Sequence, residues 1–466
     1  MTLPAWQGDI LATGELYRVG GAVRDRLLDI EVADSDFLVR GISAGALEEL
    51  LTRHGAWSRV GKAFGVYKFT PRGGATVDIV FPRTETSVGV GHRDFEVRFD
   101  ETLPVEADLA RRDFTINAIA ERIPDGRVID PFHGRQDLEA RALRMIFPRA
   151  FDEDPLRILR GARFAARFEL RLDGPTRAAM TAAAGLLSTV SPERVQDEVS
   201  KMLIQCQRPS RALDALHQTG SLVTWFPELE RCAGVVQNEY HPDDVYWHTL
   251  KTCDCAPRER LVVRWAALLH DLGKVDTRLV VTENGEARVV FYGHEVVGAE
   301  LAERVLTRLR YSNEVVSSCR HLVREHMYHY EASWKAATVR RFMRRIGDDA
   351  IDDLLALREA DCRSRDLAGE IADLEELRAR IDHERRARAT LTVRDLAVDG
   401  NDVVRETGKR PGPEVGSVLQ QLLEKVTDDP AENTRERLLE ILRAMTDVKA
   451  GEKGKPGGKE KSRKPA

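Results

Sequence analysis

The apolar and polar positions follow two different patterns, and the change between them comes near residue 150. Before that point, short apolar runs alternate with amphipathic segments, as in mixed α/β structure. Strands are predicted at 16–19, 57–70 and 75–83, and helices at 22–28 and 43–55. Ser43 is placed to cap the second helix and Gly55 to end it, while Gly73-Gly74 provides a turn between the last two strands.

A polar segment, residues 84–105, follows these strands and is predicted to be a mobile loop because it is rich in polar residues and carries glycines. From residue 107 the pattern turns helical, and after 150 nearly every segment has helical periodicity. One interruption, at 282–293, is predicted to be either an exposed loop or a small hairpin turned by Asn284-Gly285. Residues 449–466 are rich in lysine, glycine and proline, bury nothing, and are predicted to be disordered.

Composition narrows the class of protein. A chain of 466 residues is too long for one ordinary domain, and its 42% hydrophobic content supports buried cores. The net charge of −5 includes 71 basic residues, which allows local basic surfaces. No signal-peptide pattern and no apolar run of about 20 residues is present, which predicts a cytoplasmic protein without membrane association. The six cysteines lack disulfide-framework or zinc spacing and are interpreted as free thiols.

Three aspartates accompany the predicted strands. Asp34 and Asp36 are two apart on a strand-like run that follows the glycine pair Gly20-Gly21, so both carboxylates can face one side. Asp78 lies on a later strand that can run beside them. Oxygen ligands suit Mg²⁺, and a glycine turn entering a helix offers N–H groups to a phosphate. These features indicate a metal–triphosphate site, although two aspartates with this spacing are also common on ordinary surfaces.

Five segments carry a resemblance to a known family. They are GGAVRD, ADSD, ARRDFTINAIA, DPFHGRQDL and EDPLRILRGARFAARF, in this order. Together they resemble the class II tRNA nucleotidyltransferase and bacterial poly(A) polymerase family. The resemblance implies a polymerase-β-like α/β head at 1–125 and an all-α neck at 126–225. It also implies template-independent addition of CMP or AMP to an RNA 3′ end from CTP and ATP.

The resemblance assigns roles to individual residues. Asp34 and Asp36 are implied to hold Mg²⁺ as catalytic ligands, with Asp78 as a third carboxylate. Nucleotide contacts are implied for Gly20, Gly21, Arg24, Arg111, Arg112, Asp113, Asn117, Glu153, Asp154, Arg157 and Arg160.

Physical reasoning supports the last part of that set. Asp154 and Arg157 are three apart and so share a helix face. A carboxylate accepts from the exocyclic amino group that C and A both carry, and a guanidinium donates to ring acceptors, so the pair can read a base edge. The alternatives are simple helix capping for Asp154 and a solvated face for Arg157 and Arg160.

Three positions depart from the family pattern. Ser35 stands where an apolar residue is usual, and Asp29 and His133 stand where glycine is common. None of them replaces an implied ligand. Residues 83–100 resemble the flexible loop that the family uses for terminal A addition, and this argues against an enzyme that adds only CC.

Seven of the twelve histidines lie between residues 241 and 329. His270 and Asp271 sit in the apolar segment WAALLHDLGK, and an aspartate buried there must be partnered. Imidazoles with a carboxylate suit Mn²⁺, Fe²⁺, Ni²⁺ or Zn²⁺ better than Mg²⁺ alone. His241, His321 and His329 are interpreted as packing or surface residues.

The segment LLHDLGK resembles the HD phosphohydrolase superfamily. That resemblance implies an all-α HD domain and C-terminal helices at 226–448, whose metal would activate water against a phosphate ester. The implied metal ligands are His248, His270, Asp271 and Asp361, with His294 and His326 as further ligands. Some bacterial tRNA nucleotidyltransferases carry such a domain with 2′,3′-cyclic phosphodiesterase and phosphatase activity.

The leading interpretation is an enzyme that builds or repairs the tRNA 3′ CCA end and carries an HD hydrolase domain. Its expected partners are tRNA, ATP and CTP, with no obligate protein partner evident. One alternative is a poly(A) polymerase or an A-adding tRNA nucleotidyltransferase. Another, from a different class, is a metal phosphohydrolase whose head only binds RNA.

Overall fold

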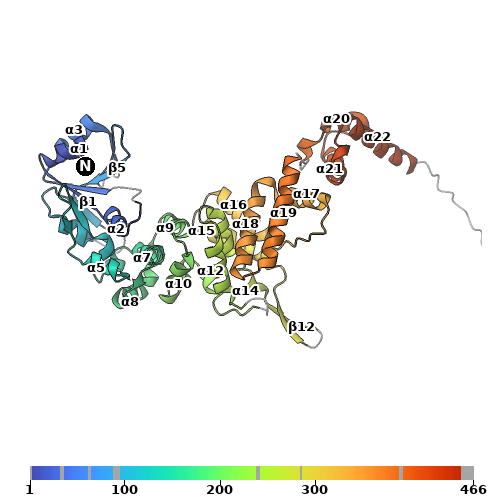
Figure 1. Ribbon diagram of the computed structural model, residues 1–466. Coiled ribbons are helices and arrows are strands. Elements are labelled where there is room, and N and C mark those ends of the chain that lie inside the picture. Colours follow the sequence, from blue (N-terminus) through green and yellow to red (C-terminus); the bar gives the residue numbers. More distant parts are fainter. Residues whose placement is uncertain are drawn as a thin grey trace, which may run out of the picture. The chain divides into compact units, whose positions relative to one another are not determined.

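The chain forms two compact units, residues 1–324 and 325–466, in a computed structural model (Figure 1). The structure describes residues 3–31, 36–60, 65–87, 95–237, 242–283, 286–387 and 392–452. Asp34, Ser35, His241 and the Asn284-Gly285 turn lie outside these ranges. Across the described ranges, no helix is both long and apolar enough to cross a membrane.

A seven-stranded mixed sheet forms the head, which confirms the predicted α/β class. The strand order is β3-β4-β5-β2-β1-β8-β9. Their bounds are β1 Glu15–Val19, β2 Asp36–Arg40, β3 Gly55–Val60, β4 Val66–Pro71, β5 Val77–Val80, β8 Ala120–Ile123 and β9 Val128–Ile129. Strand β2 is parallel to β5 and antiparallel to β1, which places β2 and β5 side by side near the middle of the sheet.

Helices α1 (Ala5–Leu11) and α3 (Ala44–His54) cover one face of this sheet through a core that includes Trp6, Leu47 and Phe37. Ser43 accepts a hydrogen bond from the Ala46 amide and Gly55 follows the last helical residue, so both predicted ends of α3 are confirmed. Because side chains alternate along a strand, the neighbours of Phe37 point to the opposite face.

A second, smaller core lies on that opposite face and includes Tyr17, Leu38 and Leu109. Helices α2 (Gly21–Leu27) and α4 (Val105–Ala110) and the 3₁₀ turn Thr115–Asn117 belong to this part of the chain. It carries several of the residues for which the resemblance implied nucleotide contacts.

Several predicted elements differ from the observed ones. The run at 57–70 holds two antiparallel strands, β3 and β4, rather than one. The segment predicted as a mobile loop includes the antiparallel strands β6 (Arg83–Ser87) and β7 (Phe95–Phe99). The helical prediction from 107 is wrong beyond α4, because residues 120–123 form β8 beside β1. At 282–293 the hairpin alternative is confirmed, since β12 (Leu279–Glu283) pairs with β13 (Glu286–Val290).

Helices make up most of the first unit after the head (Figure 1). They are α5 Gly134–Glu139, α6 Ala150–Glu153, α7 Leu156–Arg167, α8 Gly174–Ala183, α9 Pro192–Gln205, α10 Pro209–Gln218, α11 Pro227–Glu230, α12 Val245–Cys255, α13 Leu261–Leu269, α14 Lys274–Thr277, α15 His294–Arg308 and α16 Asn313–Glu325. Buried arginines connect them. Arg163 of α7 pairs with Glu198 of α9, and Arg264 of α13 donates to the carbonyls of Leu203 (2.7 Å) and Cys206 (2.9 Å). These bonds satisfy carbonyls at the end of α9 that have no partner within the helix.

Six α-helices form most of the described part of the second unit. They are α17 Ala336–Ile346, α18 Asp348–Ser364, α19 Ala368–Arg386, α20 Gly400–Thr407, α21 Pro413–Asp428 and α22 Arg435–Glu452. Helices α20, α21 and α22 share a core that includes Val403, Leu422 and Leu438. Helix α22 continues to Glu452, so the first residues of the predicted disordered tail are helical. All six cysteines are free thiols, as predicted.

Candidate functional site

Two carboxylates meet on the sheet face opposite α1 and α3. Asp36 is the first residue of β2, and Asp78 is its partner in the parallel register of β2 and β5. Their neighbours Phe37 and Ile79 belong to the core under α1 and α3, so the aspartates face the other way. Lys68 of β4 completes the row, with its Nζ 3.6 Å from an Asp78 oxygen. The predicted approach of Asp78 to the Asp36 strand is therefore confirmed, while Asp34 lies outside the described residues.

The glycine pair forms a tight turn between β1 and α2. Gly20 has φ +67°, a left-handed conformation that favours glycine, and its amide donates to the Ile119 carbonyl at 3.1 Å. A Cβ atom at Gly20 would lie 2.3 Å from a terminal nitrogen of Arg112. Gly20 therefore allows an arginine to lie directly against the turn. Gly21 has ordinary backbone angles and begins α2.

Arg24, on α2, is buried and its guanidinium is held on several sides. It donates to Asp25 at 2.7 Å and to the side-chain oxygen of Asn117, and it lies 4.3 Å above the Phe168 ring. Burial lowers the pKa of Arg24, and Asp25 offsets part of that effect. A guanidinium fixed in this way is positioned in advance, which reduces the entropy lost when it binds an anion.

Asp108, a residue that sequence reasoning did not select, holds both neighbouring arginines. It is fully buried and accepts from Arg111 at 2.6 Å and from Arg112 at 3.0 Å. Burial raises the pKa of Asp108, but Arg112 and Arg111 together lower it below the ordinary value. The sequence contained a signal for this role, because Asp108 precedes the two arginines by three and four residues, the spacing of one helical turn.

Asp113 connects the sheet part of the site to α7. One oxygen accepts from the Asn117 amide at 2.9 Å, and the other accepts from Arg160 Nε at 2.8 Å. Burial alone raises the pKa of Asp113, yet Arg160 and Asn117 lower it to about 2. Asn117 also accepts from Arg24, so four of the residues predicted from the sequence form one network.

The segment before α7 departs from the predicted geometry. Asp154 and Arg157 do not lie on one helix, because α7 begins at Leu156 and Asp154 ends the short α6. Asp154 accepts from the Leu156 amide at 3.2 Å and from Arg194 at 2.8 Å, so its carboxylate is already bound to the start of α7 and to α9. Arg157 lies 4.0 Å from Glu153 and donates to the Arg111 carbonyl at 3.0 Å, which joins this segment to the arginine cluster.

A second cluster lies in the helical part of the first unit. His248 of α12 and His270 and Asp271, at the end of α13, place ligand atoms within 4.8 Å of one another, and all three are buried. The Nε2 atoms of His248 and His270 each lie 3.3 Å from the same Asp271 oxygen, and Nε2 of His294 lies 3.4 Å from the other oxygen. The structure thus brings together four of the residues predicted as metal ligands.

The surroundings of this cluster orient its ring nitrogens. Nδ1 of His270 lies 2.9 Å from the Ala267 carbonyl, and Nδ1 of His294 lies 2.8 Å from the Phe291 carbonyl. A carbonyl at Nδ1 fixes the tautomer that leaves Nε2 as a ligand, and metal-binding histidines are usually held in this way. Two or three such imidazoles with a carboxylate fit a divalent transition metal.

Lys274 is a further member of the cluster that sequence reasoning missed. Its ammonium group lies 2.6 Å from Asp271 and donates to Gln237 at 2.7 Å. Although burial raises the pKa of Asp271, His270 and Lys274 lower it well below the ordinary value. The lysine lies three residues after Asp271 in the segment LLHDLGK, and that spacing was its signal.

The remaining predicted ligands, His326 and Asp361, belong to the second unit. Both are buried. Asp361, on α18, accepts from Arg358 at 3.0 Å and from Arg365 at 2.8 Å. Within its own unit, Asp361 is therefore an ion-paired carboxylate, and its role as a metal ligand stays a prediction.

Comparisons with known proteins agree with the geometry of the head. Residues 16–144 match the "Poly A polymerase head domain" model, 169–232 match the "Probable RNA and SrmB- binding site of polymerase A", and 288–442 match "tRNA nucleotidyltransferase domain 2". The Multifunctional CCA protein of Methylobacillus flagellatus is 40% identical over 364 residues, covering 75% of this chain and 84% of that protein. The Multifunctional CCA protein of Ralstonia nicotianae is 38% identical over 372 residues, covering 75% of this chain and 82% of that protein.

A solved structure extends the likeness to the whole fold. The crystal structure of the Bacillus stearothermophilus CCA-adding enzyme in complex with CTP has a TM-score of 0.70 and 25% identity. The alignment covers 97% of this chain and all of that one. The mixed-sheet head with paired carboxylates and an arginine cluster, followed by helices, defines a nucleotidyltransferase. The chain belongs to the family of CCA-adding tRNA nucleotidyltransferases to which the multifunctional CCA proteins belong.

Proposed function

We propose that this chain adds CMP and AMP to the 3′ end of tRNA from CTP and ATP, and so builds or repairs the CCA end. CCA addition is the activity for which its relatives are named. The observation that carries the proposal is the register pair of Asp36 and Asp78, on the sheet face reached by the turn at Gly20. Carboxylates fit the hard Mg²⁺ ion, and divalent metal use follows from the family.

In this proposal the residues of the head divide the work. Asp34 and Asp36, with Asp78, hold Mg²⁺, which when bound would neutralise charge on the transferring phosphate. Arg24, Arg111 and Arg112 are held in advance by buried acceptors and bind the triphosphate. Base selection falls to the segment before α7. Its Asp154 would have to exchange its contact with Arg194 for the amino group of the incoming base.

The test is incorporation of single nucleotides. Purified protein is incubated with tRNA that ends before CCA and with CTP, ATP or both. We expect two C residues from CTP and a terminal A only when CTP is also present. Incorporation of A without C would support the poly(A) or A-adding alternative and overturn the CCA assignment. Asp36→Asn should abolish addition, whereas Asp197→Asn, an exposed carboxylate of α9 paired with Lys201, should leave it unchanged.

We further propose that the His248, His270 and Asp271 cluster holds a divalent transition metal, Ni²⁺, Mn²⁺, Fe²⁺ or Zn²⁺, and hydrolyses phosphate esters. The proposal is supported by His270 and His294, whose Nδ1 atoms lie against backbone carbonyls while their Nε2 atoms lie beside Asp271. A metal bound there would lower the pKa of a bound water. The ammonium group of Lys274, 2.6 Å from Asp271, compensates the charge of that carboxylate.

This second activity is separable from the first. His270→Ala should abolish metal-stimulated hydrolysis of a 2′,3′-cyclic nucleotide while CCA addition continues. His217→Ala, a half-buried histidine paired with Glu230, serves as the control and should retain both activities. If Asp36→Asn left every activity intact, the head would be only an RNA-binding module and the phosphohydrolase alternative would hold. Loss of both activities in His270→Ala would contradict independent sites.

A further inference from the structure

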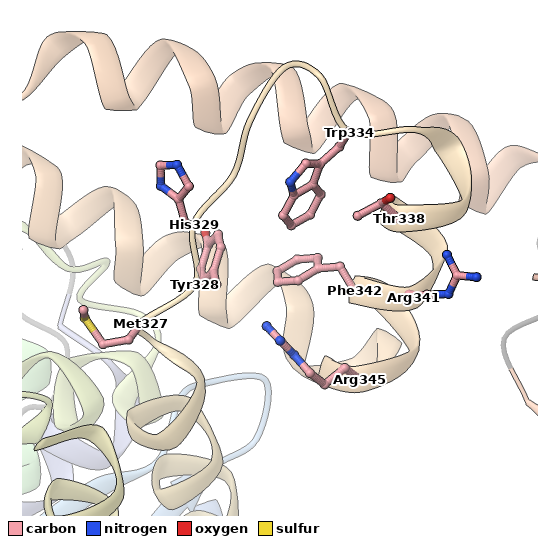
Figure 2. A pocket seen from close by; sticks show the side chains of 8 residues that line it. All are labelled: Met327, Tyr328, His329, Trp334, Thr338, Arg341, Phe342 and Arg345. Atoms are coloured by element: carbon pink, nitrogen blue, oxygen red, sulfur yellow. The ribbon is translucent and has the colours of Figure 1, made fainter. Parts of the chain in front are cut away.

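The second unit contains a cavity that the two proposed activities do not use. It has a volume of about 330 Å³ and lies between the segment 327–334 and helix α17. Figure 2 shows its lining, which combines three aromatic rings with basic and polar side chains. The lining residues are Met327, Tyr328, His329, Trp334, Thr338, Arg341, Phe342 and Arg345. Its size falls at the lower end of the range for small-ligand pockets, about 300 to 1,000 Å³.

The aromatic rings form a connected wall. The Phe342 ring lies 5.0 Å from Tyr328 and 5.7 Å from Trp334, measured between ring centroids. Phe342 and Tyr328 are buried, whereas Trp334 is half-buried and therefore offers part of its indole to a ligand. In Figure 2, His329 lies across the cavity from Trp334, and its side chain is 82% exposed.

A cationic group stands at the base of this wall. The Arg345 guanidinium lies 5.6 Å from the Phe342 ring centroid, and Figure 2 shows it below that ring, on the cavity side. Arg345 contacts Glu325 through Nε at 3.2 Å, and its side chain is 56% exposed. An ion pair this exposed contributes little stability, and a guanidinium has five donors, so Arg345 can bind a phosphate at small cost.

A buried polar atom adds a second, independent observation. The hydroxyl of Tyr328 is buried without a hydrogen-bond partner among the described residues, and Tyr328 lines the cavity with less than a tenth of its surface exposed. Buried hydroxyls are almost always satisfied, and a ligand or water in this region would satisfy this one.

We propose that this cavity binds one unstacked ribonucleotide, with its base on Trp334 and its phosphate on Arg345. Aromatic rings beside an arginine are the arrangement with which proteins hold unpaired bases, because every base has a stackable face. An acidic peptide would use the arginine but not the aromatic wall. The nucleotide can come from two sources, an unpaired position of the RNA substrate or a free mononucleotide. The first source rests on the proposed CCA addition, and the second does not.

Photo-crosslinking tests the proposal on the full chain. The probe is 8-azido-AMP, and labelled peptides are identified by mass spectrometry so that the cavity is distinguished from the head. We expect label within residues 327–345. Trp334→Leu and Arg345→Gln should each reduce that label about tenfold, the scale of one lost stacking contact. Arg363→Gln is the matched control, because Arg363 is 55% exposed and paired with Glu359 outside the cavity.

Competition identifies the source of the nucleotide. If tRNA lacking CCA displaces the label from 327–345, the ligand is an RNA nucleotide; if only AMP displaces it, the ligand is a free nucleotide. Label confined to the head, or label at 327–345 that neither competitor displaces, overturns the proposal. CCA addition is measured on each variant in parallel. If the unmodified chain adds CCA but its cavity is not labelled, this inference alone is refuted. If the unmodified chain does not incorporate C, the proposed function is refuted instead.

Discussion

Asp113 shows how a single buried acid can organise a site. It receives hydrogen bonds from Asn117 and Arg160, and through Asn117 it is connected to Arg24. A buried carboxylate with these partners stays ionised, since neutralising it would remove the charge that pairs with Arg160. The pKa of Asp113 is about 2 for this reason, although burial alone would raise it. Its charge is therefore part of the folded state at any physiological pH.

This depressed pKa predicts a specific pH dependence. Because the folded-state pKa is below the ordinary 3.8, ionised Asp113 stabilises the fold above pH 4, and this stabilisation is lost as the pH falls toward 2. The shift corresponds to about 2 kcal/mol. Asp113→Asn should therefore lower the free energy of unfolding at pH 6 and flatten its decrease between pH 5 and pH 2.5, measured by urea denaturation. Asp197→Asn is the control, because Asp197 is exposed and its pair with Lys201 is screened by salt. If the free energy of unfolding decreased equally between pH 5 and pH 2.5 in Asp113→Asn and in the unmodified chain, the prediction would be contradicted.

Two departures from the family pattern have a conformational explanation. Asp29 and His133 stand where the family resemblance implied glycine, and both adopt left-handed backbone angles, with φ of 54° and 61°. Such angles cost a residue with a Cβ atom about 1–2 kcal/mol, less for Asp. The backbone at both positions therefore favours glycine.

His133→Gly should therefore stabilise the protein. Relief of the left-handed strain exceeds the added entropy of the unfolded chain, and we expect a gain of roughly 0.5–1 kcal/mol. His133 is exposed and precedes α5, so its side chain contributes little packing. Gln136→Gly, at an exposed position inside α5, is the matched control and should destabilise by about 1 kcal/mol. Thermal unfolding of the two variants measures the contrast, and equal losses in both would refute the strain argument.

At the scale of elements, the turn between β1 and α2 is tightly constrained at its first glycine. Gly20 combines a left-handed φ with an arginine lying where a side chain would begin. Gly21 has neither constraint, since the nearest atom to a Cβ there is a terminal nitrogen of Arg24 at 3.4 Å. The two glycines are adjacent in sequence but differ in their structural requirement.

Gly20→Ala should therefore reduce activity far more than Gly21→Ala. The left-handed angle costs alanine about 1–2 kcal/mol, and the new methyl group displaces Arg112 from the turn. We expect kcat/KM for CTP to fall at least about tenfold in Gly20→Ala, at a temperature where the variant stays folded. Gly21→Ala should stay close to the unmodified enzyme. Equal activity of the two variants would show that the position of Arg112 does not matter for CTP.

Local sequence signals predicted the elements whose ends are fixed by their own residues. Ser43 and Gly55 bound α3 as expected, because an N-cap and a helix-ending glycine act within one turn. Strand β8 was missed for the opposite reason. Its residues follow a helical pattern, but pairing with β1 outweighs local preference. Strands β6 and β7 lie outside the main sheet. Strand β6 is polar, so alternation of apolar residues could not reveal it. Strand β7 does alternate apolar and polar residues, but the glycines and the overall polarity of the segment favoured a loop.

The sequence predicted which residues belong to the site, but not which of them contact one another. Arg24 and Asn117, and likewise Asp113 and Arg160, were selected from motifs, yet their hydrogen bonds join positions 93 and 47 residues apart. Asp154 shows the limit of spacing arguments, since the expected helix face is interrupted by the end of α6. Asp108 and Lys274 were missed because each pairs with a residue predicted for the site and has no predicted ligand of its own, and a motif search looks for ligand-binding groups first.

At the scale of the molecule, the paired carboxylates of the sheet and the histidine cluster belong to one chain but offer different donors. The carboxylates favour a hard ion, and the imidazoles around Asp271 favour a transition metal. Metal binding to the folded state stabilises it by mass action, about 2.7 kcal/mol at a hundredfold excess over Kd. If a variant of one site loses the stabilisation that a metal gives to the unmodified protein, that stabilisation is assigned to this site without an activity measurement.

Mn²⁺ or Ni²⁺ should raise the melting temperature of the unmodified protein and of His217→Ala, but much less that of His270→Ala. The comparison uses the metal-induced shift rather than the absolute melting temperature, because replacing buried His270 also removes packing. The carboxylates of the sheet are the same in all three proteins, so their contribution cancels. An equal shift in His270→Ala would place the transition metal elsewhere and remove the basis for the hydrolase activity.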